Sequence, residues 1–136
     1  MKRYAMIAAF ILAAASTRAG EISWEKNYDD GLASAKKAKK LVMVDVYTDW
    51  CGWCKKLDKD VYTDKPVIEK VAKDFVAVKL NPESSKKNGA IAEKFGVRGY
   101  PCILFLDSDG KELSRIGGYV PAAEFARQLD AVSKKK

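Results

Sequence analysis

The sequence predicts an α/β protein in which a central mixed β-sheet is flanked by helices. The segment 41–47, LVMVDVY, is almost continuously apolar, as a central strand buried on both faces should be. Strand-like and helix-like segments alternate along the chain, which is typical of parallel strands joined by helical crossovers. The segment 108–110, SDG, predicts a hairpin near the C-terminus and therefore an antiparallel pair as well.

The first half of the chain predicts five elements, each with a local signal. The helix after the first strand is rich in alanine and lysine, and the helix after the apolar strand begins at Cys51. Another helical segment follows, with Asp64 as its cap and Pro66 in its first turn. In chain order, these elements are expected at 22–24, 29–40, 41–47, 51–59 and 63–74.

The second half predicts a strand, a helix, the two strands of the hairpin and a last helix. Gly96 ends the first of these helices, and Gly117 with Gly118 breaks the hairpin. Pro121 opens the last helix, in which apolar residues recur at helical spacing. The expected bounds are 75–80, 89–95, 102–107, 112–116 and 121 to about 132.

The N-terminus has the pattern of a secretory signal peptide, which we expect to span residues 1–19. Two basic residues precede an apolar run over 4–15, and small residues follow it. The preferred cleavage site is after Ala19, and the second choice is after Ala15. The run is short for a transmembrane helix, which needs about 20 residues, so a retained anchor is the weaker alternative. We therefore expect a periplasmic or otherwise secreted protein with one domain at 20–136.

The charge of the chain does not single out a nucleic-acid partner. The formal net charge is +7, and it falls to +4 when the three basic residues of the expected signal peptide are removed. Lysine runs at 36–40 and 134–136 are basic enough for nucleic acid, but no aromatic residues are interleaved with them. A solvated helix end and a frayed terminus explain them more simply. We expect a monomer with no nucleic-acid partner.

The three cysteines carry the chemistry that the sequence predicts. Cys51 and Cys54 stand in the segment CGWC, where a strand turns into a helix, and this spacing allows them to switch between dithiol and disulfide. Unpaired N–H groups and the dipole at the helix N-terminus favour a thiolate at Cys51. We therefore predict that Cys51 is an exposed attacking thiol and that Cys54 is a buried resolving thiol.

From about residue 21 to 132, the chain resembles the thioredoxin-fold family. Four blocks match the family in order, followed by a glycine at 117, and together they are far more specific than a lone CxxC. The long stretch 56–70 resembles exported relatives such as the C-terminal domain of the disulfide interchange protein DsbD. The matching blocks lie at 44–46, 50–55, 78–81 and 96–101.

The resemblance implies a role for a carboxylate in the central strand. A charged Asp45 in an apolar strand is costly, so its pKa should rise and it could accept a proton. The resemblance implies that this buried base deprotonates Cys54, and that Lys79 matches the family's buried lysine. The simpler alternative, that Asp45 only pairs with Lys79, is compatible with the catalytic role.

The resemblance also implies a surface that binds substrate. Pro101 matches the family's cis-proline, although an ordinary trans turn is the alternative. The backbone at Tyr100 would then pair with an extended substrate strand. Trp50 matches the family's residue at its position, whereas Trp53 differs from the family's residue at its own. Trp53 could contact the substrate or only cover the start of the helix.

Cys102, directly after Pro101, stands where the family usually has threonine. We expect it to be a small buried side chain at the start of a strand. Two alternatives are a third redox thiol and, together with Cys51 and Cys54, a three-thiolate site for a soft metal ion. The chain has no histidine and no second CxxC, so a closed zinc site is not expected.

The sequence thus predicts an exported thiol–disulfide oxidoreductase that acts on protein disulfides. It would need no cofactor, because the electrons reside on Cys51 and Cys54, and a membrane-bound redox partner would reduce it again. Without an imidazolium to stabilise the thiolate, we expect a reducing or intermediate potential. The rival hypotheses are a redox-inactive binding module with a structural disulfide and a soft-metal chaperone.

Overall fold

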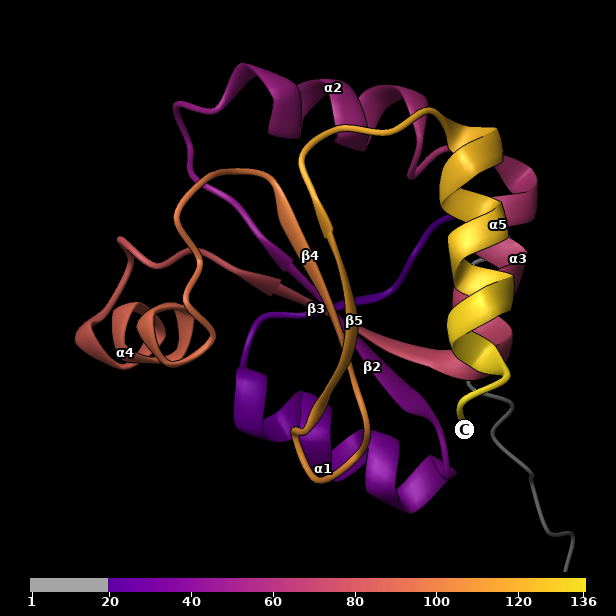
Figure 1. Ribbon diagram of the computed structural model, residues 1–136, viewed down its shortest axis with the longest axis horizontal. Coiled ribbons are helices and arrows are strands. Elements are labelled where there is room, and N and C mark those ends of the chain that lie inside the picture. The colour runs from indigo at the N-terminus through magenta and orange to yellow at the C-terminus, as the bar shows by residue number, and fades with distance from the viewer. Residues whose placement is uncertain (1–19) are drawn as a thin grey trace, which may run out of the picture.

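The computed structural model describes residues 20–136, which form a five-stranded sheet with helices on both faces (Figure 1). The expected signal peptide at 1–19 lies outside the described residues. Within residues 20–136, no helix is both long enough and apolar enough to span a bilayer. The elements are β1 (Trp24–Glu25), α1 (Tyr28–Ala38), β2 (Leu41–Val46), α2 (Gly52–Asp60), α3 (Lys65–Asp74), β3 (Phe75–Leu80), α4 (Lys86–Lys94), β4 (Cys102–Leu106), β5 (Glu112–Gly117) and α5 (Ala122–Ser133).

The predicted mixed sheet is confirmed, and its strand order is β1-β3-β2-β4-β5. β1, β3 and β2 run parallel, whereas β4 is antiparallel to both β2 and β5. The central position of β2 explains its composition. All six of its residues are buried, because strands flank both of its edges and helices cover both faces of the sheet.

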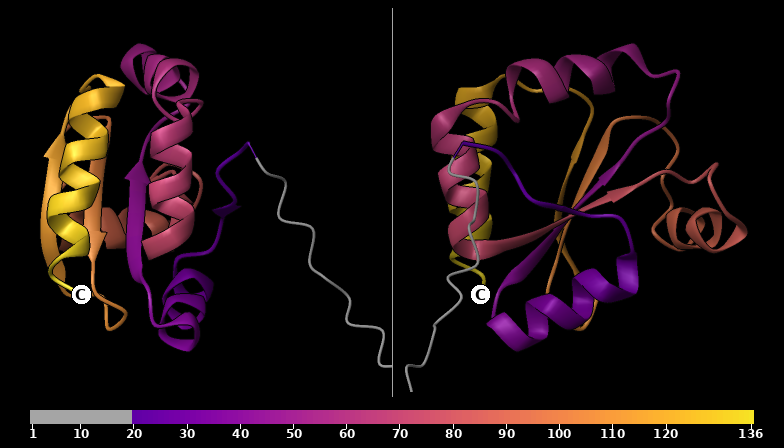
Figure 2. Two further views of the ribbon diagram at one scale, coloured as in Figure 1. Left: turned by 90° about the vertical axis from the view of Figure 1, so that its right-hand side faces the viewer. Right: turned by 180° about the vertical axis from the view of Figure 1, so that it is seen from behind.

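The helices form a layer on each face of the sheet, as the three views show (Figures 1 and 2). α1 and α4 pack on the face that carries Val42 and Val44 of β2. α2, α3 and α5 pack on the other face, against Met43 of β2 and Phe105 of β4. Successive side chains of a strand point to opposite faces, so each strand supplies both cores.

The five helices start within three residues of the predicted positions, and the largest difference is at α4. α4 begins at Lys86, three residues before the expected start, because the Ser85 hydroxyl accepts the Asn88 N–H at 3.1 Å and caps the helix there. The first turn of α4 holds two lysines, so the spacing of apolar residues in the sequence does not show that the helix starts there. Pro121 precedes α5 as its N-cap residue, and the first helical residue is Ala122.

Candidate active site

Cys51 and Cys54 form a disulfide at the start of α2, just beyond the C-terminal end of β2. Cys51 is the N-cap residue, and its Sγ accepts a hydrogen bond from the Cys54 N–H at 3.1 Å. The first N–H groups of a helix have no partner within the helix, so they favour negative charge on the capping atom. The geometry therefore suits a thiolate at Cys51 once the disulfide is reduced.

The predicted exposure of Cys51 is wrong for the disulfide form of the protein. Cys51 is 5% exposed and Cys54 is 2% exposed, so both count as buried. As the N-cap, Cys51 directs its sulfur back over the first turn of α2, where the bond to Cys54 holds it. The difference in exposure between the two cysteines has the predicted direction, but it is small.

Asp45 lies near the C-terminal end of β2, between Lys79 on β3 and Ile103 on β4, and is fully buried. The Lys79 ammonium lies 2.6 Å from Asp45 Oδ2. Burial raises the pKa of Asp45, and the nearby ammonium only partly opposes this effect. Asp45 thus has the raised proton affinity that a buried base needs, and it is also paired with Lys79.

Asp58 is a charged neighbour that the sequence analysis missed. Its Oδ1 lies 2.6 Å from Lys79 Nζ, so one ammonium bridges Asp45 and Asp58. Burial works to lower the pKa of Lys79, but these two carboxylates outweigh it and raise that pKa. Asp58 follows Cys54 by four residues on α2, and this spacing on one helical face was the available signal.

Three aromatic rings surround the same ammonium, and the sequence analysis did not identify them. Lys79 Nζ lies 4.9 Å from the ring centre of Trp24, 4.8 Å from that of Tyr47 and 5.2 Å from that of Tyr62. Such cation–π contacts stabilise a partly desolvated cation. An open pocket lined in part by Trp24, Tyr47, Asp58 and Lys79 connects this cluster with solvent.

Two tryptophans, one directly before Cys51 and one between the two cysteines, each pack against a tyrosine from a distant part of the chain. Trp50 is 68% exposed and Trp53 is 59% exposed, and they are the large exposed apolar side chains of the described residues. Trp50 packs edge-on against Tyr100 at 5.8 Å and donates its indole N–H to Glu83 at 2.8 Å. Trp53 contacts Tyr119 at 5.5 Å between ring centres. Tryptophan and tyrosine are enriched at protein interfaces, so these two pairs are candidates for contact with a partner.

Pro101 lies beside the segment that leads to Cys51. The Tyr100–Pro101 peptide bond is cis, and the Pro101 carbonyl accepts the Gly118 N–H at 2.9 Å. β4 starts at the next residue, where Cys102 pairs with Val46 at the end of β2. This register brings the Tyr100–Pro101 loop to the C-terminal end of β2, where the chain continues toward Cys51.

Cys102 is a free, buried thiol on the face of the sheet that α1 and α4 cover. Burial raises its pKa, and the opposing effect of Arg115 is smaller. Within residues 20–136, no group of three or more cysteine, histidine, aspartate or glutamate side chains is arranged to hold a metal ion. Cys102 therefore does not form such a group with the two disulfide cysteines.

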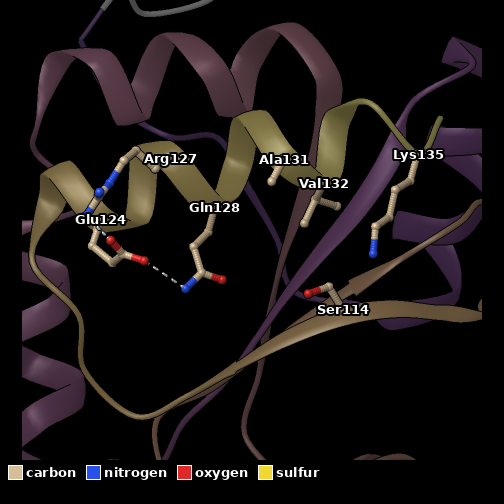
Figure 3. A pocket seen from close by; sticks show the side chains of 7 residues that line it. All are labelled: Ser114, Glu124, Arg127, Gln128, Ala131, Val132 and Lys135. Atoms are coloured by element: carbon tan, nitrogen blue, oxygen red, sulfur yellow. Dashed lines mark hydrogen bonds and ion pairs between the residues drawn. The ribbon is translucent and has the colours of Figure 1, made fainter.

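A second pocket lies between β5 and α5 (Figure 3). Its polar side chains are largely occupied with one another: Glu124 accepts a hydrogen bond from Gln128 at 3.2 Å and pairs with Arg127. Lys135 donates to the Leu113 carbonyl. The disulfide cysteines, Asp45, Asp58 and Lys79 are not among its lining residues.

Comparisons with known proteins match most of the chain. The family model of the thioredoxin-like domain matches residues 28–133. The thiol:disulfide interchange protein DsbD of Actinobacillus pleuropneumoniae is 39% identical over 99 residues, which are 71% of this chain and 17% of that protein. This chain therefore spans about a sixth of the length of that relative.

Solved structures share the fold. The structure of a DsbH oxidoreductase superposes with a TM-score of 0.76 at 21% identity, over 93% of this chain and 94% of that one. The oxidised C-terminal domain of DsbD from Neisseria meningitidis superposes with a TM-score of 0.64 at 23% identity, over 75% of this chain and 89% of that one.

Proposed function

The chain belongs to the thioredoxin-like domain family, and on this premise we propose that it is an exported thiol–disulfide oxidoreductase that acts on protein disulfides. One observation carries the proposal: the Cys51–Cys54 disulfide sits at the N-terminus of α2, and one charged cluster links Asp45 in the neighbouring strand to α2. The helix start favours the attacking thiolate, and the buried carboxylate can take up a proton.

The reaction proceeds by two exchanges at sulfur. In the reduced protein, the Cys51 thiolate attacks one sulfur of a client disulfide, forming a mixed disulfide and releasing the other client sulfur as a thiolate, which takes up a proton from solvent. The Cys54 thiol then gives its proton to Asp45, and its sulfur attacks Cys51. The Cys51–Cys54 bond forms, and the second client sulfur leaves as a thiolate that takes up a proton from solvent, while Asp45 returns its proton to solvent. The client has gained two electrons.

The exposed aromatic side chains support a role in client binding. A client strand that pairs with the backbone at Tyr100, beside Pro101, would lie next to the start of α2. Trp50 and Trp53 offer apolar surface for the residues that flank the client cysteine. We assign substrate binding to Trp53, Tyr100 and Pro101, and we assign supporting roles to Lys79 and Trp50.

The proposed setting is the periplasm or another exported location, reached through the signal peptide expected at 1–19. The cycle needs no bound cofactor, because the electrons are stored on Cys51 and Cys54. A dithiol donor must reduce the disulfide after each turnover, and we assign this role to a membrane-bound redox partner of a monomeric protein.

Trapping of mixed disulfides tests the proposal. Cys54→Ser should accumulate client proteins bound to Cys51, because the resolving thiol is gone, whereas Cys51→Ser should accumulate none. The matched control is Cys102→Ala, which should cycle without trapping. Non-reducing electrophoresis followed by mass spectrometry reads out the adducts, and equal trapping by the two serine variants would reject the assigned roles.

The burial of both disulfide cysteines favours one other candidate, a binding module with a permanent structural disulfide. Resistance to reduction distinguishes the two functions. A structural disulfide should withstand a mild dithiol at neutral pH, whereas a redox-active pair should equilibrate with it. Mass shift after alkylation measures the reduced fraction.

A further inference from the structure

Two buried polar atoms beside the Asp45–Lys79 pair have no hydrogen-bond partner among the described residues. One is Asp45 Oδ1, because Lys79 contacts only the other carboxylate oxygen. The other is the hydroxyl of Tyr62, a residue that is 6% exposed. An unpaired buried oxygen destabilises the folded protein, so each such group calls for an explanation.

The packing of Tyr62 fixes its ring beside the base. Tyr62 lies in the turn between α2 and α3, and its ring packs against Trp24 at 4.9 Å and Phe125 at 5.7 Å. The same ring faces the Lys79 ammonium, which contacts Asp45. Burial and the negative charge of Asp45 together raise the pKa of Tyr62 well above its ordinary value. The hydroxyl therefore keeps its proton and lies within electrostatic reach of the carboxylate.

We propose that Tyr62 is a positioning residue for the Asp45 base, whose free oxygen receives a hydrogen bond from the Tyr62 hydroxyl, directly or through one water molecule. This inference rests on the proposed function. A neutral phenol can donate one proton, and an ionised carboxylate needs donors on both oxygens. Lys79 already divides its donors between Asp45 and Asp58, so Tyr62 supplies the second donor that this base lacks.

No other charged or titratable neighbour of Asp45 can do the same. Lys79 on β3 contacts the opposite oxygen, and Asp58 on α2 is acceptor-only when it is ionised. Tyr47, directly after β2, faces Lys79 with its ring. Cys102 on β4 lies on the α1 and α4 side of the sheet, and Asp45 affects it only through its charge.

The hydrogen bond between Tyr62 and Asp45 has a defined consequence for the pKa of Asp45. A hydrogen bond from Tyr62 favours the ionised form of Asp45 and so opposes the rise in pKa that burial causes. Removing the hydroxyl should therefore raise the pKa of Asp45 further. At a fixed pH, less of the base would be ionised, and the step in which Cys54 loses its proton would slow.

Tyr62→Phe tests this inference, since it removes one oxygen and keeps the ring against Lys79. The matched control is Tyr47→Phe, whose ring also faces Lys79. The readout is the pH titration of the Asp45 carboxyl carbon by NMR, in the reduced and the oxidised protein. The midpoint should move to higher pH in Tyr62→Phe and stay at the wild-type value in Tyr47→Phe. An unchanged midpoint in Tyr62→Phe would overturn the inference.

Kinetics supply the second arm. The acid limb of the pH–rate profile for disulfide reduction should move to higher pH in Tyr62→Phe, with the rate on that limb lowered about three- to tenfold. In an Asp45→Asn background, Tyr62→Phe should leave the rate unchanged, and a further loss there would contradict the assignment. The NMR titration needs no client, so it decides the contact even if trapping rejects the proposed function.

Discussion

Cys51 and Cys102 are equally covered by the protein, each with 5% of its surface exposed, yet their surroundings favour opposite chemistry. Cys51 caps α2, and its sulfur accepts a backbone N–H. Cys102 opens β4 within an apolar cluster, and burial raises its pKa. We therefore expect the helix start at Cys51, rather than exposure alone, to distinguish the more reactive of these two cysteines.

The same contrast applies to the acidic side chains. Asp45 is fully buried, and its single ion pair leaves one oxygen without a partner. Asp130, which pairs with Lys70 at 2.7 Å, lies at the surface, where such a pair adds little to stability. The costly arrangement is linked through Lys79 to Asp58 on α2, the helix that the disulfide begins, and perturbed carboxylates of this kind are candidates for a functional role.

The largest expected effect is on alkylation of the reduced protein. At neutral pH, iodoacetamide should modify Cys51 about 100-fold faster than Cys102, because the helix start favours the Cys51 thiolate and the apolar cluster disfavours the Cys102 thiolate. Peptide mass spectrometry over a time course measures both rates in one sample. Equal rates would break the comparison between the two cysteines.

The next largest effect is expected when the charge of the Asp45 carboxylate is removed. Asp45→Asn should slow turnover near neutral pH about tenfold, since Cys54 would lose its buried proton acceptor. The control is Asp130→Asn, which removes a surface carboxylate far from this role and should leave turnover unchanged. Stopped-flow reduction of a protein disulfide measures the rates. Unchanged kinetics in Asp45→Asn would reject the catalytic role.

The pH dependence of stability tests the same carboxylate. The pKa of Asp45 is raised in the folded state, so the folded protein binds this proton more tightly than the unfolded chain. Stability from this group is therefore present below the ordinary value of 3.8 and is lost as pH rises through the folded pKa. Asp45→Asn should remove that loss and be the more stable protein near pH 7, as urea unfolding would show. Greater stability of the wild type there would contradict this expectation.

The sequence predicted the sheet and most of the helices because their signals are local. The apolar run of β2, the Asp109–Gly110 turn and the proline before α5 each determine one element through short-range chemistry. The start of α4 was missed because a serine cap is a weaker signal than apolar spacing.

The site was predicted where it could be matched to motifs, and missed where it depends on distant contacts. Asp45 and Lys79 lie 34 residues apart, and only the family resemblance joined them before the structure. The rings of Trp24 and Tyr62 converge on Lys79 from β1 and from the turn after α2. No spacing in the sequence encodes that convergence, since it arises from strand order and helix packing.

A smaller effect is expected when the Cys102 thiol is removed. Cys102→Ala should keep disulfide-reductase activity, because Cys51 and Cys54 form a complete pair, and should lose about 1 kcal/mol of stability from lost packing. Loss of turnover, or a Cys51–Cys102 bridge in peptide maps of the oxidised protein, would place the third thiol in the mechanism.

The smallest effect is expected for Cys102→Thr, which installs the residue that the family usually has and keeps a side chain of similar size at the start of β4. Its loss of stability near pH 7 should be smaller than that of Cys102→Ala. At alkaline pH the difference in stability between the wild type and Cys102→Thr should become smaller. The pKa of Cys102 is raised, so the wild type loses stability as pH rises above the thiol's ordinary value of 9.0 and through the folded pKa, whereas threonine does not titrate. Urea unfolding at about pH 7 and about pH 10 should therefore show a smaller pH-dependent loss in Cys102→Thr than in the wild type. Equal losses would mean that Cys102 ionises as freely in the folded protein as in the unfolded chain, and the contrast with Cys51 would then rest on the helix start alone.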